Sequence, residues 1–301
     1  MTNPTPKYLP AAVSLLVALA AGCAGFRTVD VPSANQNSRI QHLVFHFTTV
    51  PFDESLRLLT ERTDRPVSVH YLIPEPGDPT YPRSDPEVYR LVPEQRRAWH
   101  AGRSAWGRKQ SLNDSSIGIE LVNLSTCHSR RPDAEVQTPD MLSCRFAPFP
   151  EAQIDLVIRL VQDILERHPE IDPVDIVGHS DIAPDRRSDP GPLFPWRRLY
   201  ENGIGAWFDD DTVGTYRRRF DRAPPDPALV RRALSAYGYS LDAPDDPELA
   251  DIRFRFVVRA FQLHFRPERA DGVVDAETAA RLWALLEKYR PRALDGLTDG
   301  A

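Results

Sequence analysis

The chain has 301 residues, of which 41% are hydrophobic and 27% charged, a length that favours one sizeable core and a smaller second domain. Its formal net charge is -6 and no basic block stands out, which argues against nucleic acid as a partner. Nothing in the composition points to an obligate protein partner. The 29 prolines cluster in 74–86, 139–150 and 223–227, where long ordered loops or linkers are expected.

The N-terminus has the features of an export signal over 1–23. An apolar run, 8–21, is too short for a comfortable membrane span and is typical of a secretory signal. The stretch Leu19-Ala20-Ala21-Gly22-Cys23 resembles a bacterial lipobox, in which Cys23 is lipidated and becomes the first residue after cleavage. The alternatives are a signal cleaved without lipidation and an uncleaved anchor. By the same resemblance, Ala24 directs a Gram-negative lipoprotein to the outer membrane, facing the periplasm.

The elements that follow are first a tether and then alternating strands and helices. Residues 24–35 are small and polar, as suits a flexible connection. Helical periodicity is visible around Leu56–Leu59, and Glu120 points away from its apolar neighbours in an alternating segment. The expected strands are 41–48, 67–73, 88–92 and 116–122.

The clearest helix is 151–167, in which apolar residues recur at i, i+3, i+4 and i+7. After it, 174–178 is typical of a short buried strand that delivers His179 at its carboxyl end. Strands that alternate with helices predict an α/β domain over 36–207, with a mixed central β-sheet flanked by helices.

A change in composition and periodicity marks a second, small domain. Residues 208–225 are charged and are expected to connect the two domains, and 292–301 are expected to be a tail. Between them, 226–291 predict a three-helix domain. Its helical stretches are 226–237, 247–265 and 276–289.

Three separated residues could converge on a metal ion. His46 lies in the first expected strand, His179 follows the last, and Asp189 stands ten residues beyond it. Two histidines and one carboxylate suit a catalytic zinc site, which needs three protein ligands and an open position for water. Taken singly, a histidine in a strand is more often a structural residue.

The segments around these residues resemble one family. Residues 46–48 (HFT), 117–123 (IGIELVN) and 178–191 (GHSDIAPDRRSDPG) are similar, in this order, to the type-2 N-acetylmuramoyl-L-alanine amidases, and most of all to their outer-membrane lipoprotein members. The family shares its fold with peptidoglycan recognition proteins. The resemblance implies one zinc ion per chain, and peptidoglycan or muropeptides as substrate. It implies that the zinc ligands are His46, His179 and Asp189.

The same resemblance implies roles for further residues. Glu120 matches the catalytic carboxylate, and Arg187 stands where relatives commonly carry lysine, as a group that stabilises an oxyanion. The alternatives are a solvated carboxylate and a surface salt-bridge residue. Three residues from a family segment beside the groove are candidates for substrate binding, although core packing explains a tryptophan equally well. They are Trp99, His100 and Trp106.

Cys127 and Cys144 remain once Cys23 is assigned to lipid. Two thiols in an oxidising compartment often pair, and a pair left unbridged is the alternative.

The C-terminal domain has a signature of its own. Phe261-Gln262, 271–275 (DGVVD), Thr278 and Leu282 resemble the common three-helix peptidoglycan-binding domain, and a generic helical appendage is the alternative. Tethering such a domain to a catalyst raises the effective concentration of substrate. For the whole chain, the rival to the amidase is a protein of the same fold that binds muropeptides without cutting them. Within the enzyme class, the other candidate substrates are anhydro-muropeptides.

Overall fold

The computed structural model describes residues 29–241 and 245–298. The chain divides into two units, 1–37 and 38–301, and the second contains the helices and strands named below. The expected signal and Cys23 lie outside the described residues. No helix in the described ranges is long and apolar enough to cross a bilayer.

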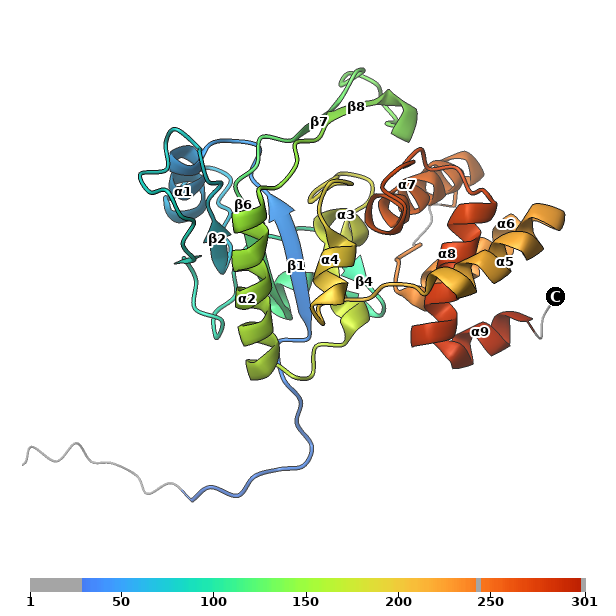
Figure 1. Cartoon of the computed structure of the whole chain (residues 1–301), viewed down its shortest axis with the longest axis horizontal. Coiled ribbons are helices and arrows are strands. Elements are labelled where there is room, and N and C mark those ends of the chain that lie inside the picture. Colours follow the sequence, from blue (N-terminus) through green and yellow to red (C-terminus); the bar gives the residue numbers. More distant parts are fainter. Residues whose placement is uncertain (1–28, 242–244, 299–301) are drawn as a thin grey trace, which may run out of the picture. The chain divides into compact units, whose positions relative to one another are not determined.

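A five-stranded mixed sheet forms the centre of the second unit (Figure 1). Its strand order is β3-β2-β6-β1-β9, in which β2, β6, β1 and β9 run parallel and β3 is antiparallel to β2. The central strands are buried on both faces, as expected for parallel strands covered on both sides. The strands are β1 (His42–Phe47), β2 (Tyr71–Ile73), β3 (Tyr89–Arg90), β6 (Ser116–Leu121) and β9 (Ile176–Gly178).

The helix α2 (Glu151–Arg167) has the predicted bounds and packs its buried apolar stripe against the sheet. A hairpin of β7 (Thr126–Ser129) and β8 (Leu142–Arg145) is closed by a disulfide between Cys127 and Cys144, so the expected pairing is present. The remaining elements of this domain are α1 (Phe52–Thr60), β4 (Ala105–Trp106), β5 (Lys109–Gln110), α3 (His179–Ile182), α4 (Trp196–Glu201) and the short 3-10 turns Leu112–Asp114, Pro139–Met141 and Pro173–Asp175.

Three expected strands are clearly shorter than predicted. The segment 174–178 is reduced to β9, because Val174 and Asp175 belong to the preceding 3-10 turn. The segment expected over 67–73 enters the sheet only at Tyr71, because Ser68 pairs its backbone with the carbonyl of Trp99 instead of with a strand of the sheet. The segment 88–92 is reduced to β3, since it is an edge strand that pairs with the short β2 on one side. Alternation of side chains predicts an extended backbone but not whether a partner strand lies alongside.

The C-terminal region is helical, and three of its helices match the prediction closely. They are α6 (Pro227–Tyr237), α7 (Pro247–Phe265) and α8 (Ala276–Tyr289). The expected connecting segment 208–225 instead folds as α5 (Asp210–Arg222), which packs Phe220 against Trp283 of α8. Residues 292–298 of the expected tail belong instead to α9 (Pro291–Thr298), which buries Leu294 and Leu297.

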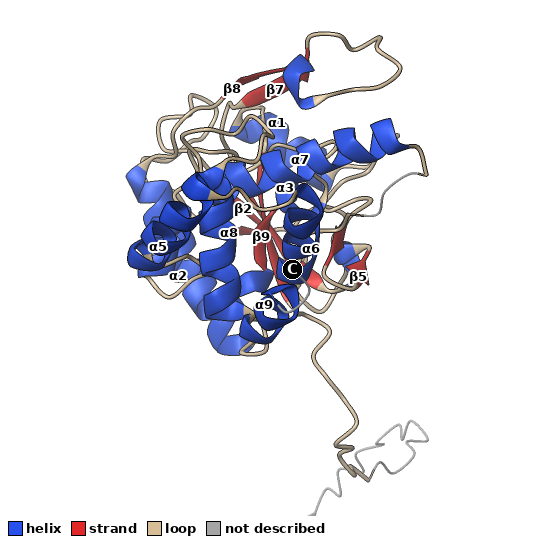
Figure 2. Cartoon of the chain, turned by 90° about the vertical axis from the view of Figure 1, so that its right-hand side faces the viewer, coloured by secondary structure: helices blue, strands red, loops and turns tan. Residues whose placement is uncertain are grey.

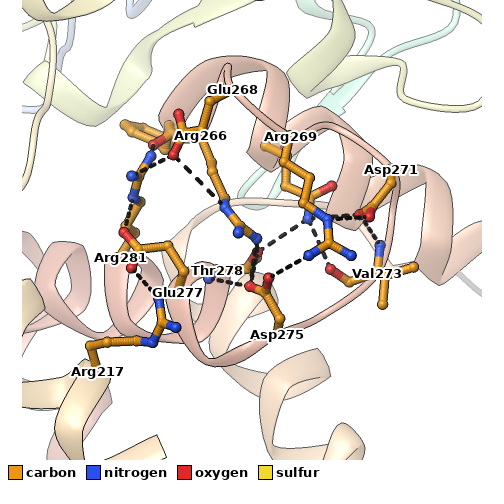
Figure 3. A network of polar contacts seen from close by, with 12 residues as sticks. Arg217, Arg266, Glu268, Arg269, Asp271, Val273, Asp275, Glu277, Thr278 and Arg281 are labelled. Carbon is orange, nitrogen blue, oxygen red and sulfur yellow. Dashed lines mark hydrogen bonds and ion pairs between the residues drawn. The ribbon is translucent and has the colours of Figure 1, made fainter. Parts of the chain in front are cut away.

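The signature residues of the C-terminal domain build the loop between α7 and α8 (Figure 3). The buried Gln262 amide accepts from Gly272 N at 2.8 Å and donates to Val273 O at 2.9 Å. Asp275 caps α8 by accepting from Thr278 N at 2.9 Å, and it also binds Arg266. These contacts show that the signature specifies the loop and the start of a helix.

The C-terminal helices pack directly on the sheet domain. In Figure 2, α7 runs across the molecule beside α3, with which it is in contact. Trp106 pairs its backbone with Tyr239 and packs its ring edge-on against the Tyr239 ring, with 4.8 Å between centroids. Asp181 of α3 accepts from Tyr239 Oη at 2.6 Å and contacts His264 Nδ1 at 2.8 Å. A buried interface therefore joins the two domains into one compact unit.

Candidate metal centre

Three adjacent parallel strands carry the candidate residues to one edge of the sheet. Phe45 of β1 lies opposite Gly178 of β9, so the residues that follow them, His46 and His179, emerge side by side. On the other flank of β1, His46 is the register partner of Glu120 in β6. The carboxyl ends of parallel strands are where α/β proteins commonly place their sites. The topology therefore brings together residues that are far apart in the sequence.

The predicted ligands converge. The Nδ1 atoms of His46 and His179 are 2.9 Å apart, and Asp189 Oδ2 is 3.2 Å from the first and 3.0 Å from the second. All three side chains are buried, and their ligand atoms lie within 4.8 Å of one another. Two nitrogens and one carboxylate oxygen form the donor set that zinc prefers. The residues present therefore fit a zinc ion with a position left for solvent or substrate.

A chain of hydrogen bonds fixes the ring of His46. Ser116 Oγ donates to Leu112 O at 2.6 Å, so it can accept from His100 Nε2, 3.2 Å away. His100 Nδ1 then accepts from His46 Nε2 at 2.9 Å, which leaves the lone pair of His46 on Nδ1. Gly118 makes room for this arrangement, because a Cβ at that position would lie 2.6 Å from the His100 ring. The hydrogen bonds thus select the tautomer of His46 that can bind a metal.

His179 is fixed in the same sense. Its Nε2 lies 3.2 Å from Ala101 O, and a carbonyl can only accept, so Nε2 carries the proton and Nδ1 carries the lone pair. Burial, followed by the charge on His179, lowers the pKa of His46 to about 4. Burial alone would raise the pKa of Asp189, but the neighbouring His179 and His46 hold it below its ordinary value. His46 and Asp189 are therefore in the protonation states that metal binding needs.

Glu120 faces the same pocket without making a contact with a ligand atom. Burial, together with the charge of Asp189, raises its pKa to about 8, against the opposing effect of Arg187. Arg187 is exposed, lines the pocket and forms no ion pair with any residue in the described ranges. A carboxyl group with a pKa near neutrality beside an unpaired guanidinium is suited to acid–base chemistry on an oxygen that gains negative charge.

The pocket above the ligands has a volume of about 650 Å³, within the range of small-molecule sites. One wall is α1, with Leu58 and Leu59, and another is the hairpin, from Cys127 to Leu142. The C-terminal domain also contributes, because Phe256 of α7 lines the pocket. This contact could not be predicted from the sequence, since an apolar position in a helix does not reveal which distant segment covers it.

The three candidate substrate-binding residues have different environments. His100 lines the pocket but lies beneath His46, which it orients. Trp99 is 51% exposed and binds Ser68, a pocket residue, through its backbone N–H at 2.9 Å, so it lies at the rim. The expectation for Trp106 is wrong. Its side chain is buried at the domain interface and donates to Val174 O at 3.1 Å, so no surface remains for a substrate.

Comparisons with known proteins agree with this geometry. Residues 36–192 match the family described as N-acetylmuramoyl-L-alanine amidase, and residues 224–282 match a family described as a peptidoglycan binding domain. The N-acetylmuramoyl-L-alanine amidase AmiD of Escherichia coli (strain K12) is 43% identical over 293 residues, which are 94% of this chain and 97% of that protein.

Solved structures extend the likeness to the fold. The crystal structure of AmpDh3 from Pseudomonas aeruginosa has a TM-score of 0.77 at 43% identity, covering 88% of this chain and 99% of that chain. The complex of AmiD from E. coli with the substrate anhydro-N-acetylmuramic acid-L-Ala-D-gamma-Glu-L-Lys has a TM-score of 0.72 at 43% identity, covering 86% of this chain and 93% of that one. These matches span both domains.

Proposed function

The chain belongs to the N-acetylmuramoyl-L-alanine amidase family, and we propose that it uses one zinc ion per chain to hydrolyse the amide between the muramic acid lactyl group and the L-alanine of the stem peptide. The observation that carries the proposal is the convergence of His46, His179 and Asp189, whose ligand atoms lie within 4.8 Å of one another in a pocket that Glu120 also lines.

The residues of the site divide the reaction between them. Zinc held by the three ligands would polarise the scissile carbonyl and lower the pKa of the attacking water towards ~7. Glu120 accepts a proton from that water and returns it to the leaving alanine nitrogen, a double role for which its place in the pocket beside the three ligands is suited. Arg187 stabilises the negative charge that develops on the carbonyl oxygen. His100 keeps His46 in its ligating tautomer.

The rival function is binding of muropeptides without cleavage. A protein that only binds needs neither ligand atoms in fixed tautomers nor a carboxyl group of raised pKa beside them. This chain has both, and they support catalysis.

For the substrate, we propose peptidoglycan and its released muropeptides, including forms with an anhydro sugar. The support is the AmiD complex with an anhydro-muropeptide and the match of residues 224–282 to a peptidoglycan binding domain. Mass analysis of products from intact sacculi and from isolated muropeptides separates these substrates.

For its location, we propose an outer-membrane lipoprotein that faces the periplasm, anchored through lipid on Cys23 and tethered by 24–35. The support is the lipobox-like stretch in front of Cys23. Labelling cells with a radioactive fatty acid should mark the wild-type protein and not Cys23→Ser. Equal labelling of both would contradict the anchor.

The zinc assignment is tested by metal content and activity together. Purified protein should hold about one zinc per chain, and a chelator should abolish release of stem peptides until zinc is restored. His179→Ala should lose the metal and the turnover, whereas His128→Ala, an exposed change in the hairpin, should keep the metal. Full turnover by metal-free protein would refute the zinc mechanism.

A further inference from the structure

Helix α7 of the C-terminal domain reaches the catalytic pocket along one face. Phe256 lines the pocket, and the residue three positions earlier, Arg253, pairs with Asp185 at 2.8 Å. Arg255 pairs with Asp140 beside the hairpin at 2.7 Å. The helix therefore contacts both the loop that carries Asp189 and the disulfide-closed hairpin.

Arg259 stands three positions beyond Phe256 and lies beneath the pocket wall. Its side chain is buried, with 5% exposed. Nη1 donates to Ser188 Oγ at 3.1 Å, and Nη2 lies 3.3 Å from Cys144 Sγ and 3.8 Å from Cys127 Sγ. Within the described ranges no carboxylate pairs with it, and burial lowers its pKa to about 10, which still leaves it charged at neutral pH. Burying a guanidinium without a carboxylate partner lowers the stability of the fold, which indicates that its remaining contacts are functionally important.

The contacts of Arg259 converge on the neighbour of a metal ligand. Ser188 is buried, stands between Arg187 and Asp189, and donates from Oγ to Cys127 Sγ at 3.3 Å. The Asp189 carbonyl is held from the other side by Ser180 N at 2.8 Å. The Arg259 guanidinium thus links α7 to the hairpin and to the loop that carries Asp189.

We propose that Arg259 is a positioning residue of the active site, through which the C-terminal domain holds Ser188 and, with it, the metal ligand Asp189. The inference rests on the proposed zinc site. It gives the peptidoglycan-binding domain a second role, because the geometry of the loop that carries Asp189 depends on a side chain from α7.

The test is the zinc affinity of the full chain, measured by competition with a chelator. Arg259→Met should weaken zinc binding by about 10- to 100-fold, the usual effect of losing a group that orients a ligand. Arg259→Lys should recover part of the affinity, since an ammonium can still donate to Ser188 but cannot contact the sulfurs as well. The matched control is Arg255→Met, which removes an arginine from the same helix and should change the affinity less than about twofold.

A double-mutant cycle separates positioning from general stability. Ser188→Ala should weaken zinc binding, and adding it to Arg259→Met should weaken binding no further, because both changes break one connection. Ser188→Ala is the milder change and carries the test if Arg259→Met does not fold. Unchanged zinc affinity in a folded Arg259→Met protein, or in Ser188→Ala, would overturn the inference, as would fully additive effects. Wild-type protein that binds no zinc would instead overturn the proposed function.

Discussion

The two carboxyl groups of the site have pKa values displaced in opposite directions. Asp189 lies between two histidines and stays ionised, as its proposed role as a metal ligand requires. Glu120 has no such partners, and burial beside the charge of Asp189 raises its pKa to about 8. A pair of acids separated in this way is the pattern that distinguishes a ligand from a proton carrier. The structure thus supplies a physical basis for roles that the sequence could suggest only by resemblance.

Replacing Glu120 with glutamine tests whether this residue transfers protons and does not bind the metal. Glu120→Gln keeps the shape of the side chain and removes the group that moves the proton, so turnover should fall by at least about 100-fold while zinc content stays at the wild-type level. Both are measured on one preparation, by metal analysis and by mass analysis of released peptides. Glu61→Gln, an exposed change at the end of α1, is the control. Wild-type turnover in Glu120→Gln would remove Glu120 from the mechanism.

At the scale of residues, sequence analysis predicted the positions of those side chains whose placement is determined by the segment that carries them. His46 lies near the end of β1 and His179 follows β9, two strands whose register places them together, and Asp189 lies in the loop ten residues further on; each is in a recognisable motif. It failed for Trp106, because a motif beside a groove does not say which of its aromatic residues turn inward. It could not find Arg259, whose partners come from three other segments of the chain.

At the scale of elements, periodicity predicted the buried helices well. The bounds of α2, α7 and α8 agree with the apolar stripes that they bury. Helix α5 was missed because it is strongly charged and buries only Val213 and Phe220. Its stability comes from packing on α8 and not from its own pattern. The sheet was predicted as a set of strands, but its order depends on contacts that no local pattern encodes.

Glu94 links the end of α2 to the sheet through hydrogen bonds, so the free energy of unfolding should decrease in acid. Burial alone would raise its pKa, but hydrogen bonds from Arg167, Tyr71 and His168 lower it to about 2. A depressed pKa stabilises the fold above the ordinary value of 4.5, and this stabilisation is lost as the pH falls from 4.5 to about 2. The contribution is at most about 3 kcal/mol.

Urea unfolding between pH 7 and pH 2 measures this effect. Glu94→Gln should be less stable than wild type at pH 7, and the difference should shrink as the pH falls through that window. Glu87→Gln, which alters an exposed carboxylate near β3, should follow the wild-type curve. A difference between Glu94→Gln and wild type that does not change with pH would contradict the assigned pKa.

At the scale of the molecule, the C-terminal domain packs tightly against the sheet domain. The sequence suggested a wall-binding domain on a charged connection, whereas α5 is a packed helix and Asp181 is bonded to both Tyr239 and His264. Because these partners are buried, the two domains share one core. The domain therefore presents its surface to the wall in a fixed orientation relative to the catalytic pocket.

This shared core predicts a single unfolding transition. Tyr239→Phe keeps the ring but removes a donor from the buried Asp181, and it should destabilise the protein by about 1–3 kcal/mol. Both domains should unfold together in wild type and variant, followed by fluorescence and by circular dichroism. Tyr216→Phe, which removes a hydroxyl that binds Glu287 on the surface, is the control. Two separate transitions in the wild type would show that the interface does not couple the domains.

The position of Phe256 has a consequence for biosynthesis. A ribosome adds residue 256 only after the whole sheet domain has been made, and until then one side of the pocket is missing. A chain that ends before Tyr239 also leaves Trp106 uncovered, and exposed apolar surface of this kind promotes aggregation. Prematurely terminated copies are thus expected to be insoluble and to have an incomplete pocket.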